Sequence, residues 1–199
     1  MMNLPNKLTA SRLVMAPIFF ICFFLPVWFG SQLKDLSVAL VIVIFALNEL
    51  SDLFDGKIAR KRGLVTDLGK VMDPFADTFS RLTYFVCLMS ASVMPVAPFM
   101  IILWRELAIL FVRMLMMGKG KAVPANIWGK SKAVLYAVCG VLGIVLYALQ
   151  SWFSGADWLG TCSVVMNVLF YLAAVASVAS FLTYIRFIIK DGSLKSMTR

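Results

Sequence analysis

The sequence contains no histidine, and its four cysteines form no CxxC pair. Most zinc sites in proteins use histidines or closely spaced cysteines as ligands. Because the chain has neither, an ordinary zinc centre is excluded. Without histidine, any proton transfer must fall to Asp, Glu, Lys, Tyr or Cys. The cysteines lie in or beside apolar runs and are expected to be buried small apolar residues, and they are Cys22, Cys87, Cys139 and Cys162.

Acidic residues are also scarce. The 199 residues include only 10 Asp and Glu against 19 Lys and Arg, which gives a formal net charge of +9. Hydrophobic residues make up 61% of the chain and the mean hydropathy is +0.90, well above the usage of a soluble domain. This composition predicts a membrane protein whose cations mark cytoplasmic loops and contact anionic lipid, and no nucleic-acid partner is expected.

Six apolar stretches run through the chain, each near the roughly 20 residues that a bilayer-spanning helix needs. They cover approximately residues 12–30, 36–54, 73–94, 96–117, 131–150 and 162–187. The sequence therefore predicts an all-α polytopic membrane protein with six transmembrane helices, forming a single domain over residues 1–199. A short interfacial segment is expected at residues 1–11, and a basic tail at residues 189–199.

The cations gather in alternate connections between these stretches. Five lie between the second and third stretches and four lie around the connection of the fourth and fifth, whereas the other three connections together hold only Lys34. Lys and Arg accumulate on the cytoplasmic side of membrane proteins. We therefore expect both termini in the cytoplasm, with the protein in the cell membrane.

Acidic residues concentrate in one segment, residues 51–77, which holds five of the eight aspartates. Four of them form two pairs, Asp52 with Asp55 and Asp73 with Asp77, spaced so that each pair shares one face of a helix. Four carboxylates near a low-dielectric boundary repel one another unless cations neutralise them. Ligands that are all oxygen suit Mg²⁺ or Mn²⁺, and two such ions would balance the four charges.

The residues between the two pairs suit a phosphate ligand. Gly56 and Ala59 leave one helix face nearly bare, and Arg60 supplies a cationic fork for a phosphate. Gly69 gives the connection a bend or a close approach. Thr66 either donates a hydrogen bond to the ligand or caps the next helix. Together these residues indicate a metal-bound diphosphate at the cytoplasmic membrane surface.

The combined pattern, Asp52-x-x-Asp55-Gly56-x-x-Ala59-Arg60 followed by Gly69-x-x-x-Asp73-x-x-x-Asp77, resembles the signature of the CDP-alcohol phosphatidyltransferase family. The resemblance implies a six-helix membrane architecture, usually a homodimer, and a metal-dependent displacement of CMP from a CDP-linked lipid such as CDP-diacylglycerol. It implies that the metal ligands are Asp52, Asp55, Asp73 and Asp77, with Asp77 as the general base. It also implies that the CDP group is held by Gly56, Ala59, Arg60, Thr66 and Gly69.

The acceptor alcohol is indicated by three further segments. "NLPNKLTASRLVMAPIFF", "WRELAILFVR" and "VPANIWGKSKA" are similar to segments of family members that use glycerol 3-phosphate. One departure concerns the residue after the fourth aspartate, which is commonly Lys in those members but is Thr78 here, with Arg81 a turn later. Inositol phosphate, inositol and serine therefore remain alternative acceptors.

An anionic acceptor also fits the cations of the fourth and fifth stretches. Arg113, Lys130 and Lys132 are expected to bind its phosphate, whereas Arg105 and Glu106 are expected to form a structural ion pair because they lie deeper in the membrane. Two hypotheses from other classes are a divalent-cation transporter and a non-catalytic scaffold. The aspartates lie at one face only, with almost no acidic residue to continue a permeation path, so the enzyme is favoured.

Overall fold

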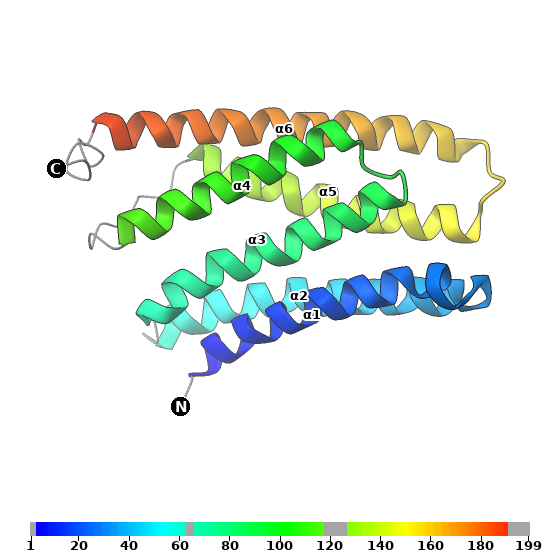
Figure 1. Cartoon of the computed structure of the whole chain (residues 1–199), viewed down its shortest axis with the longest axis horizontal. Helices are drawn as coiled ribbons and strands as arrows, with labels where there is room; N and C mark the ends of the chain where they lie inside the picture. The colour runs from blue at the N-terminus through cyan, green and yellow to red at the C-terminus, as the bar shows by residue number, and fades with distance from the viewer. Residues whose placement is uncertain (1–2, 63–65, 118–126, 191–199) are drawn as a thin grey trace.

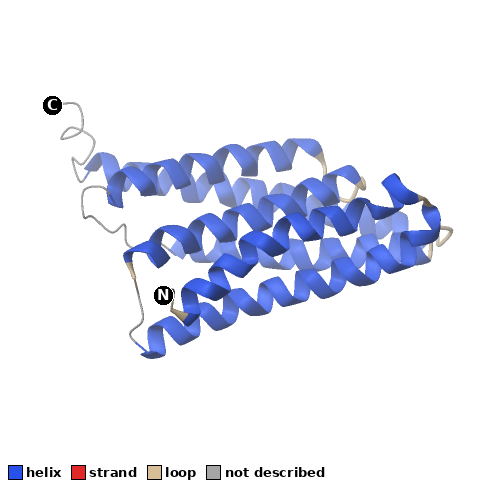
Figure 2. Cartoon of the chain, turned by 60° about the horizontal axis from the view of Figure 1, so that its bottom comes forward, coloured by secondary structure: helices blue, strands red, loops and turns tan. Residues whose placement is uncertain are grey.

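The computed structural model describes residues 3–62, 66–117 and 127–190, and within these ranges the chain is helical without any strand (Figure 2). A single turn of 3-10 helix, η1 (Ser31–Leu33), separates the first two helices. The six α-helices are α1 (Leu4–Phe29), α2 (Lys34–Arg62), α3 (Asp67–Ser90), α4 (Val96–Met117), α5 (Ile127–Trp152) and α6 (Trp158–Lys190). Each predicted apolar stretch corresponds to one helix, so the all-α prediction is confirmed for the described residues.

The first helix begins earlier than the apolar pattern indicates. Asn3 caps α1 by accepting a hydrogen bond from the backbone N–H of Asn6, and a proline occupies the first turn, where its missing N–H costs nothing. The chain from Leu4 onward is one continuous helix, which ends at Gly30 with φ 110°. Residues 4–11 are therefore the first turns of the same helix, and their place at the membrane interface stays a prediction.

The helices pack as two sets of three that share an interface. α1 packs against α2 and α3, and α6 packs against α4 and α5, while the two sets meet where α3 contacts α4 and α5 and where α2 contacts α5. Figure 1 shows that the start of α1 and the end of α6 lie at the same end of the bundle. The helix ends that flank the cation-rich connections lie at that end too, as an alternating topology requires; we call it the terminal end.

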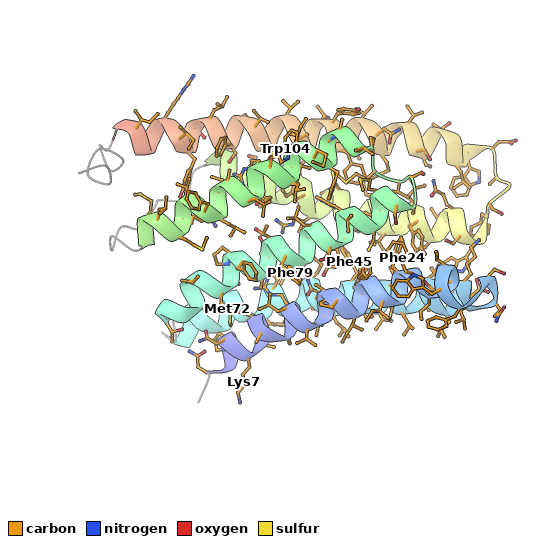
Figure 3. The ribbon with its side chains drawn as sticks, viewed as in Figure 1. Lys7, Phe24, Phe45, Met72, Phe79 and Trp104 are labelled. Carbon is orange, nitrogen blue, oxygen red and sulfur yellow. The ribbon has the colours of Figure 1, made fainter. Side chains whose placement is uncertain are left out.

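Aromatic side chains fill the core of the set formed by α1, α2 and α3. Phe19 and Phe45 both contact Tyr84, with ring centroids 4.7 and 5.0 Å from it. The helices approach closely at Gly143 of α5, where an added Cβ would stand 2.6 Å from the Leu88 side chain of α3. Many large apolar side chains instead face outward, as expected for a lipid-facing surface. The charged side chain of Lys7 instead points away from the bundle at the terminal end (Figure 3).

Among the residues that the structure describes, four stretches are long and apolar enough to cross a membrane by length and composition, namely Pro5–Phe29, Ser31–Phe54, Ser131–Trp152 and Trp158–Arg186. The other two helices, α3 and α4, have 24 and 22 residues, which is long enough. Each carries three charged residues inside its apolar run, and these are Asp73, Asp77 and Arg81 on α3 and Arg105, Glu106 and Arg113 on α4. The count of six spans therefore stays a prediction.

The orientation of the bundle can be tested by labelling single cysteines in a variant that lacks the four native ones. Ser31 and Ser154 are exposed at the end of the bundle opposite to the exposed Lys7. Because the cations predict a cytoplasmic terminal end, Ser31→Cys and Ser154→Cys should react with an impermeant maleimide in intact cells. Lys7→Cys should react only after permeabilisation. The opposite pattern would place the aspartates outside.

Candidate active site

The paired aspartates meet a buried arginine at the terminal end. Arg12 of α1 is 1% exposed, and its two terminal nitrogens donate to Oδ1 of Asp52 on α2 and to Oδ1 of Asp73 on α3. The two carboxylates themselves are 40% and 53% exposed. A single guanidinium thus joins three helices from the inside, while the carboxylates remain reachable from the outside. We call these three residues the Arg12 cluster.

Asp77, the predicted general base, lies one turn beyond Asp73 on α3. Its Oδ1 accepts a hydrogen bond from Nη2 of Arg81 at 2.6 Å, an i,i+4 ion pair on the same helix. The Arg81 guanidinium also lies over the ring of Tyr136 on α5, 5.5 Å from its centroid. Glu49, on the α2 turn before Asp52, interacts electrostatically with Arg81, Asp77 and Arg12. It adds a carboxylate that the sequence pattern does not reveal.

A small polar contact fixes the start of α1 against the start of α3. Asn6 Nδ2 donates to Thr66 Oγ1 at 3.0 Å, and the same hydroxyl accepts from the backbone N–H of Gly69 at 3.0 Å. Thr66 is therefore the N-cap of α3, the second of its two predicted roles. An added Cβ at Gly69 would stand 2.8 Å from Asn6 Oδ1, so a larger residue there would have to displace the Asn6 side chain. Contact of either residue with CDP stays a prediction.

The helices also set the spacing of the remaining motif residues. α2 continues to Arg62, so Asp52 and Asp55 lie on one helix as predicted, and α3 likewise carries both Asp73 and Asp77. For five predicted site residues the structure describes neither the side chain nor its surroundings, and these residues are Asp55, Gly56, Ala59, Arg60 and Lys130.

The donor set fits a hard divalent cation, because the available ligands are carboxylate oxygens that are partly exposed at a helix end. Among the described residues, no three Asp, Glu, His or Cys side chains converge closely enough to hold a metal ion. Asp55, the fourth predicted ligand, lies outside that search. The carboxylate oxygens of the described residues are ligands of the kind that Mg²⁺ and Mn²⁺ prefer.

A second polar cluster is buried between α4, α5 and α6. Glu106 Oε1 accepts from Arg105 Nη1 at 2.9 Å and from Lys132 Nζ at 2.5 Å, and Arg105 Nη2 donates to Ser180 Oγ at 3.0 Å. The expected ion pair of Arg105 with Glu106 is present, and Lys132 completes it. We call these four residues the Glu106 cluster. It carries one surplus positive charge, because two cations face one carboxylate.

The predicted acceptor cations are placed differently from one another. Lys132 is buried on Glu106, and its ammonium lies 4.6 Å from the centroid of the Tyr136 ring. Arg113 is exposed, two helical turns beyond Glu106 toward the terminal end. Within the described part of the chain, Arg105 Nε is buried without a hydrogen-bond partner.

These observations define a helical membrane protein with carboxylates gathered on two helices at one end of its bundle. The chain is a member of the CDP-alcohol phosphatidyltransferase family, whose family model matches residues 2–179. The predicted resemblance is therefore confirmed.

The chain is similar to particular members of that family. It is 33% identical over 191 residues to the "CDP-diacylglycerol--glycerol-3-phosphate 3-phosphatidyltransferase" of Treponema pallidum, which covers 93% of this chain and 88% of the relative. Proteins of the same name from Bacillus subtilis and Rickettsia felis are 34% and 28% identical. The alignment with the Bacillus subtilis protein covers 71% of this chain and 77% of that relative, and the alignment with the Rickettsia felis protein covers 92% and 94%.

Sequence reasoning missed Arg12 as a site residue, because it stands at the start of the first apolar stretch, far in the sequence from the segment that holds the aspartates. A signal was present in the helix start. Asn3 followed closely by Pro5 is typical of an N-cap and a first turn, which places Arg12 in the third turn of the helix rather than before it. A charged residue at that depth normally faces a partner inside the protein.

The contact between Asn6 and Gly69 yields a prediction about stability. Gly69→Ala should lower the free energy of unfolding by about 1 to 3 kcal/mol, because the new methyl group displaces Asn6 from Thr66. In an Asn6→Ala background the same substitution should be neutral or stabilising, since alanine is the better helix former. Thermal unfolding in detergent measures both values. Gly160→Ala on α6, where a Cβ meets nothing within 4 Å, is the control and should show no dependence on residue 6.

Proposed function

We propose that the protein transfers the phosphatidyl group of CDP-diacylglycerol to sn-glycerol 3-phosphate, producing phosphatidylglycerophosphate and CMP. The observation that carries this proposal is the pair of half-exposed carboxylates, Asp52 and Asp73, fixed on two helices at one end of the bundle. The proposal is supported by the membership of the chain in its family and by the printed names of its relatives.

The first substrate site comprises the aspartates and the residues between them. Asp52, Asp55, Asp73 and Asp77 would hold two Mg²⁺ or Mn²⁺ ions, which when bound would neutralise the diphosphate of the donor. The CDP group is held by the small residues and the cations of the same segment, namely Gly56, Ala59, Arg60, Thr66 and Gly69. Arg60 suits the diphosphate because its guanidinium matches phosphate oxygens.

The chemical step is an in-line displacement at the phosphorus that bears the diacylglycerol. The acceptor hydroxyl oxygen forms the new bond to this phosphorus, the bond to the CMP oxygen breaks, and its electron pair leaves with CMP. Asp77 takes the proton from the acceptor hydroxyl. Arg81 holds one oxygen of Asp77 at 2.6 Å and so limits the directions in which this carboxylate can face.

The second substrate site binds the acceptor phosphate. We assign it to Arg113, Lys130 and Lys132, the last of which belongs to the Glu106 cluster with its one surplus positive charge. Charge-assisted hydrogen bonds to a phosphate are about twice as strong as neutral ones, so this site discriminates against uncharged acceptors. Thr78, which is buried, departs from the lysine that the resemblance leads us to expect, and inositol phosphate, inositol and serine are therefore kept as alternative acceptors.

The membrane arrangement is part of the same proposal. All six helices cross the cell membrane, both termini are cytoplasmic, and the active site opens at the cytoplasmic surface near anionic lipids. The protein works as a homodimer, as the family resemblance implies. A divalent-cation transporter is less well supported, because a buried arginine lies between Asp52 and Asp73 where a permeating cation would have to pass.

Purified protein in mixed micelles tests the activity. CMP should be released from CDP-diacylglycerol only when Mg²⁺ or Mn²⁺ and glycerol 3-phosphate are both present. Asp73→Asn should reduce turnover by at least about 100-fold, because it removes a charged ligand at nearly constant volume. Asp35→Asn, which alters an exposed aspartate at the other end of the bundle, is the matched control and should retain activity. Metal-independent release of CMP would contradict the proposal.

Steady-state kinetics with both substrates separate the two sites. Arg113→Gln should raise the KM for glycerol 3-phosphate about tenfold, which corresponds to the loss of a single charge-assisted hydrogen bond, and should leave the KM for CDP-diacylglycerol unchanged. Arg186→Gln, at an exposed cation on α6 near the same end, serves as the control. Equal rates with serine or inositol would disprove the assignment of the acceptor but not the family chemistry.

A further inference from the structure

We infer that Arg12 is a positioning residue of the metal site, which holds Asp52 and Asp73 from the protein interior in the orientation that binds a divalent cation. The inference rests on the proposed metal-dependent function, in which both aspartates are ligands. It assigns a role to a residue of α1, a helix that carries none of the aspartates.

The three side chains of the Arg12 cluster differ in burial, so the site has an inner side and an outer side. Arg12 is 1% exposed, whereas Asp52 and Asp73 are 40% and 53% exposed. A cation arriving from the membrane surface reaches the carboxylates without crossing the guanidinium. Arg12 is therefore not a surface anchor that serves only topology, and its place is compatible with occupied carboxylates.

The backbone of α1 is held in place at this depth by both neighbouring helices. Ser51 Oγ of α2 donates to the carbonyl oxygen of Leu8 at 3.3 Å, and Ser80 Oγ of α3 donates to the carbonyl oxygen of Arg12 at 3.4 Å. Asn6 binds Thr66 one and a half turns before Arg12. These three contacts fix the backbone from which the Arg12 side chain extends. The guanidinium is therefore held in a defined place between α2 and α3.

The chemistry of the guanidinium explains why arginine suits this position. Its planar fork presents several donors in a fixed geometry, so one side chain can reach two carboxylates on different helices. Two carboxylates without a cation between them would repel and turn apart. Carboxylates that bind metals are commonly oriented by hydrogen bonds from residues behind them, and loss of such a residue typically weakens metal affinity by roughly 10-fold to 100-fold.

A lysine at the same position separates orientation from charge. An ammonium keeps the positive charge but acts as a single point and cannot span both carboxylates in a fixed plane. Arg12→Lys should therefore weaken the binding of Mn²⁺ by about tenfold or more. The affinity is measured directly, by the loss of the free Mn²⁺ signal in electron paramagnetic resonance, with substrate-free protein in nanodiscs.

The control removes a buried hydrogen bond between α1 and α2, two of the three helices that Arg12 joins. Ser37 of α2 is fully buried and donates to the carbonyl oxygen of Cys22 on α1 at 2.7 Å, far from the aspartates. Ser37→Ala should lower thermal stability and leave the Mn²⁺ affinity unchanged. If it weakened Mn²⁺ as much as Arg12→Lys does, the effect would be general helix packing and the inference would be wrong.

The remaining outcomes also decide the question. Unchanged Mn²⁺ affinity in Arg12→Lys would overturn the inference while the proposed metal site stands; wild-type protein that binds no Mn²⁺ would overturn both. Should Arg12→Lys not fold, Arg12→Gln is measured instead. Removal of a positive charge alone would tighten the binding of a cation, so weaker binding in Arg12→Gln supports positioning, and equal or tighter binding contradicts it.

Discussion

A buried arginine that must find its counter-charges is the constraint on which the arrangement of α1, α2 and α3 depends. Leaving the guanidinium of Arg12 without partners in a low-dielectric interior would cost several kcal/mol, and its terminal nitrogens are met by one carboxylate from each neighbouring helix. These three helices are therefore fixed in register as well as in packing. Apolar contacts alone would tolerate sliding of one helix along another, because lipid is as apolar as the helix surfaces. The ion pairs add the specificity that the apolar surfaces lack.

The second helix set is organised by the same principle, and one aromatic ring connects the two. Glu106 gathers Arg105 and Lys132 at the centre of α4, α5 and α6, and Lys132 lies over the ring of Tyr136. Arg81 from the first set lies over that ring as well. Asp77, the proposed base, and the buried cations of the Glu106 cluster are thus linked through Arg81, Tyr136 and Lys132.

The helices and the carboxylate pairs could be predicted because they follow from local pattern. Apolar runs of bilayer length fix the helices, and spacings of three and four residues fix which aspartates share a face. The partners of these residues could not be predicted, because they come from helices distant in the sequence. Lys132 illustrates the difficulty. Its place near a predicted phosphate site was reasonable from the positions of cations, yet its contact with Glu106 depends on how α5 lies against α4. Likewise, Gly69 suggested a close approach, but only the fold identifies Asn6 as the neighbour.

The length of α2 has a consequence for how a lipid substrate is handled. α2 has 29 residues, from Lys34 to Arg62, and at about 1.5 Å per residue it is roughly 44 Å long, more than the roughly 30 Å of a hydrocarbon core. The helix is therefore long enough to extend beyond the apolar layer of a bilayer. In the proposed orientation, Asp52 lies near the boundary between hydrocarbon and headgroups. Lifting a lipid into water costs about 0.8 kcal/mol for each exposed methylene group, so a donor with two acyl chains is effectively confined to the bilayer. A site at this boundary lets the headgroup react while the chains stay dissolved, and the substrate arrives by lateral diffusion in two dimensions.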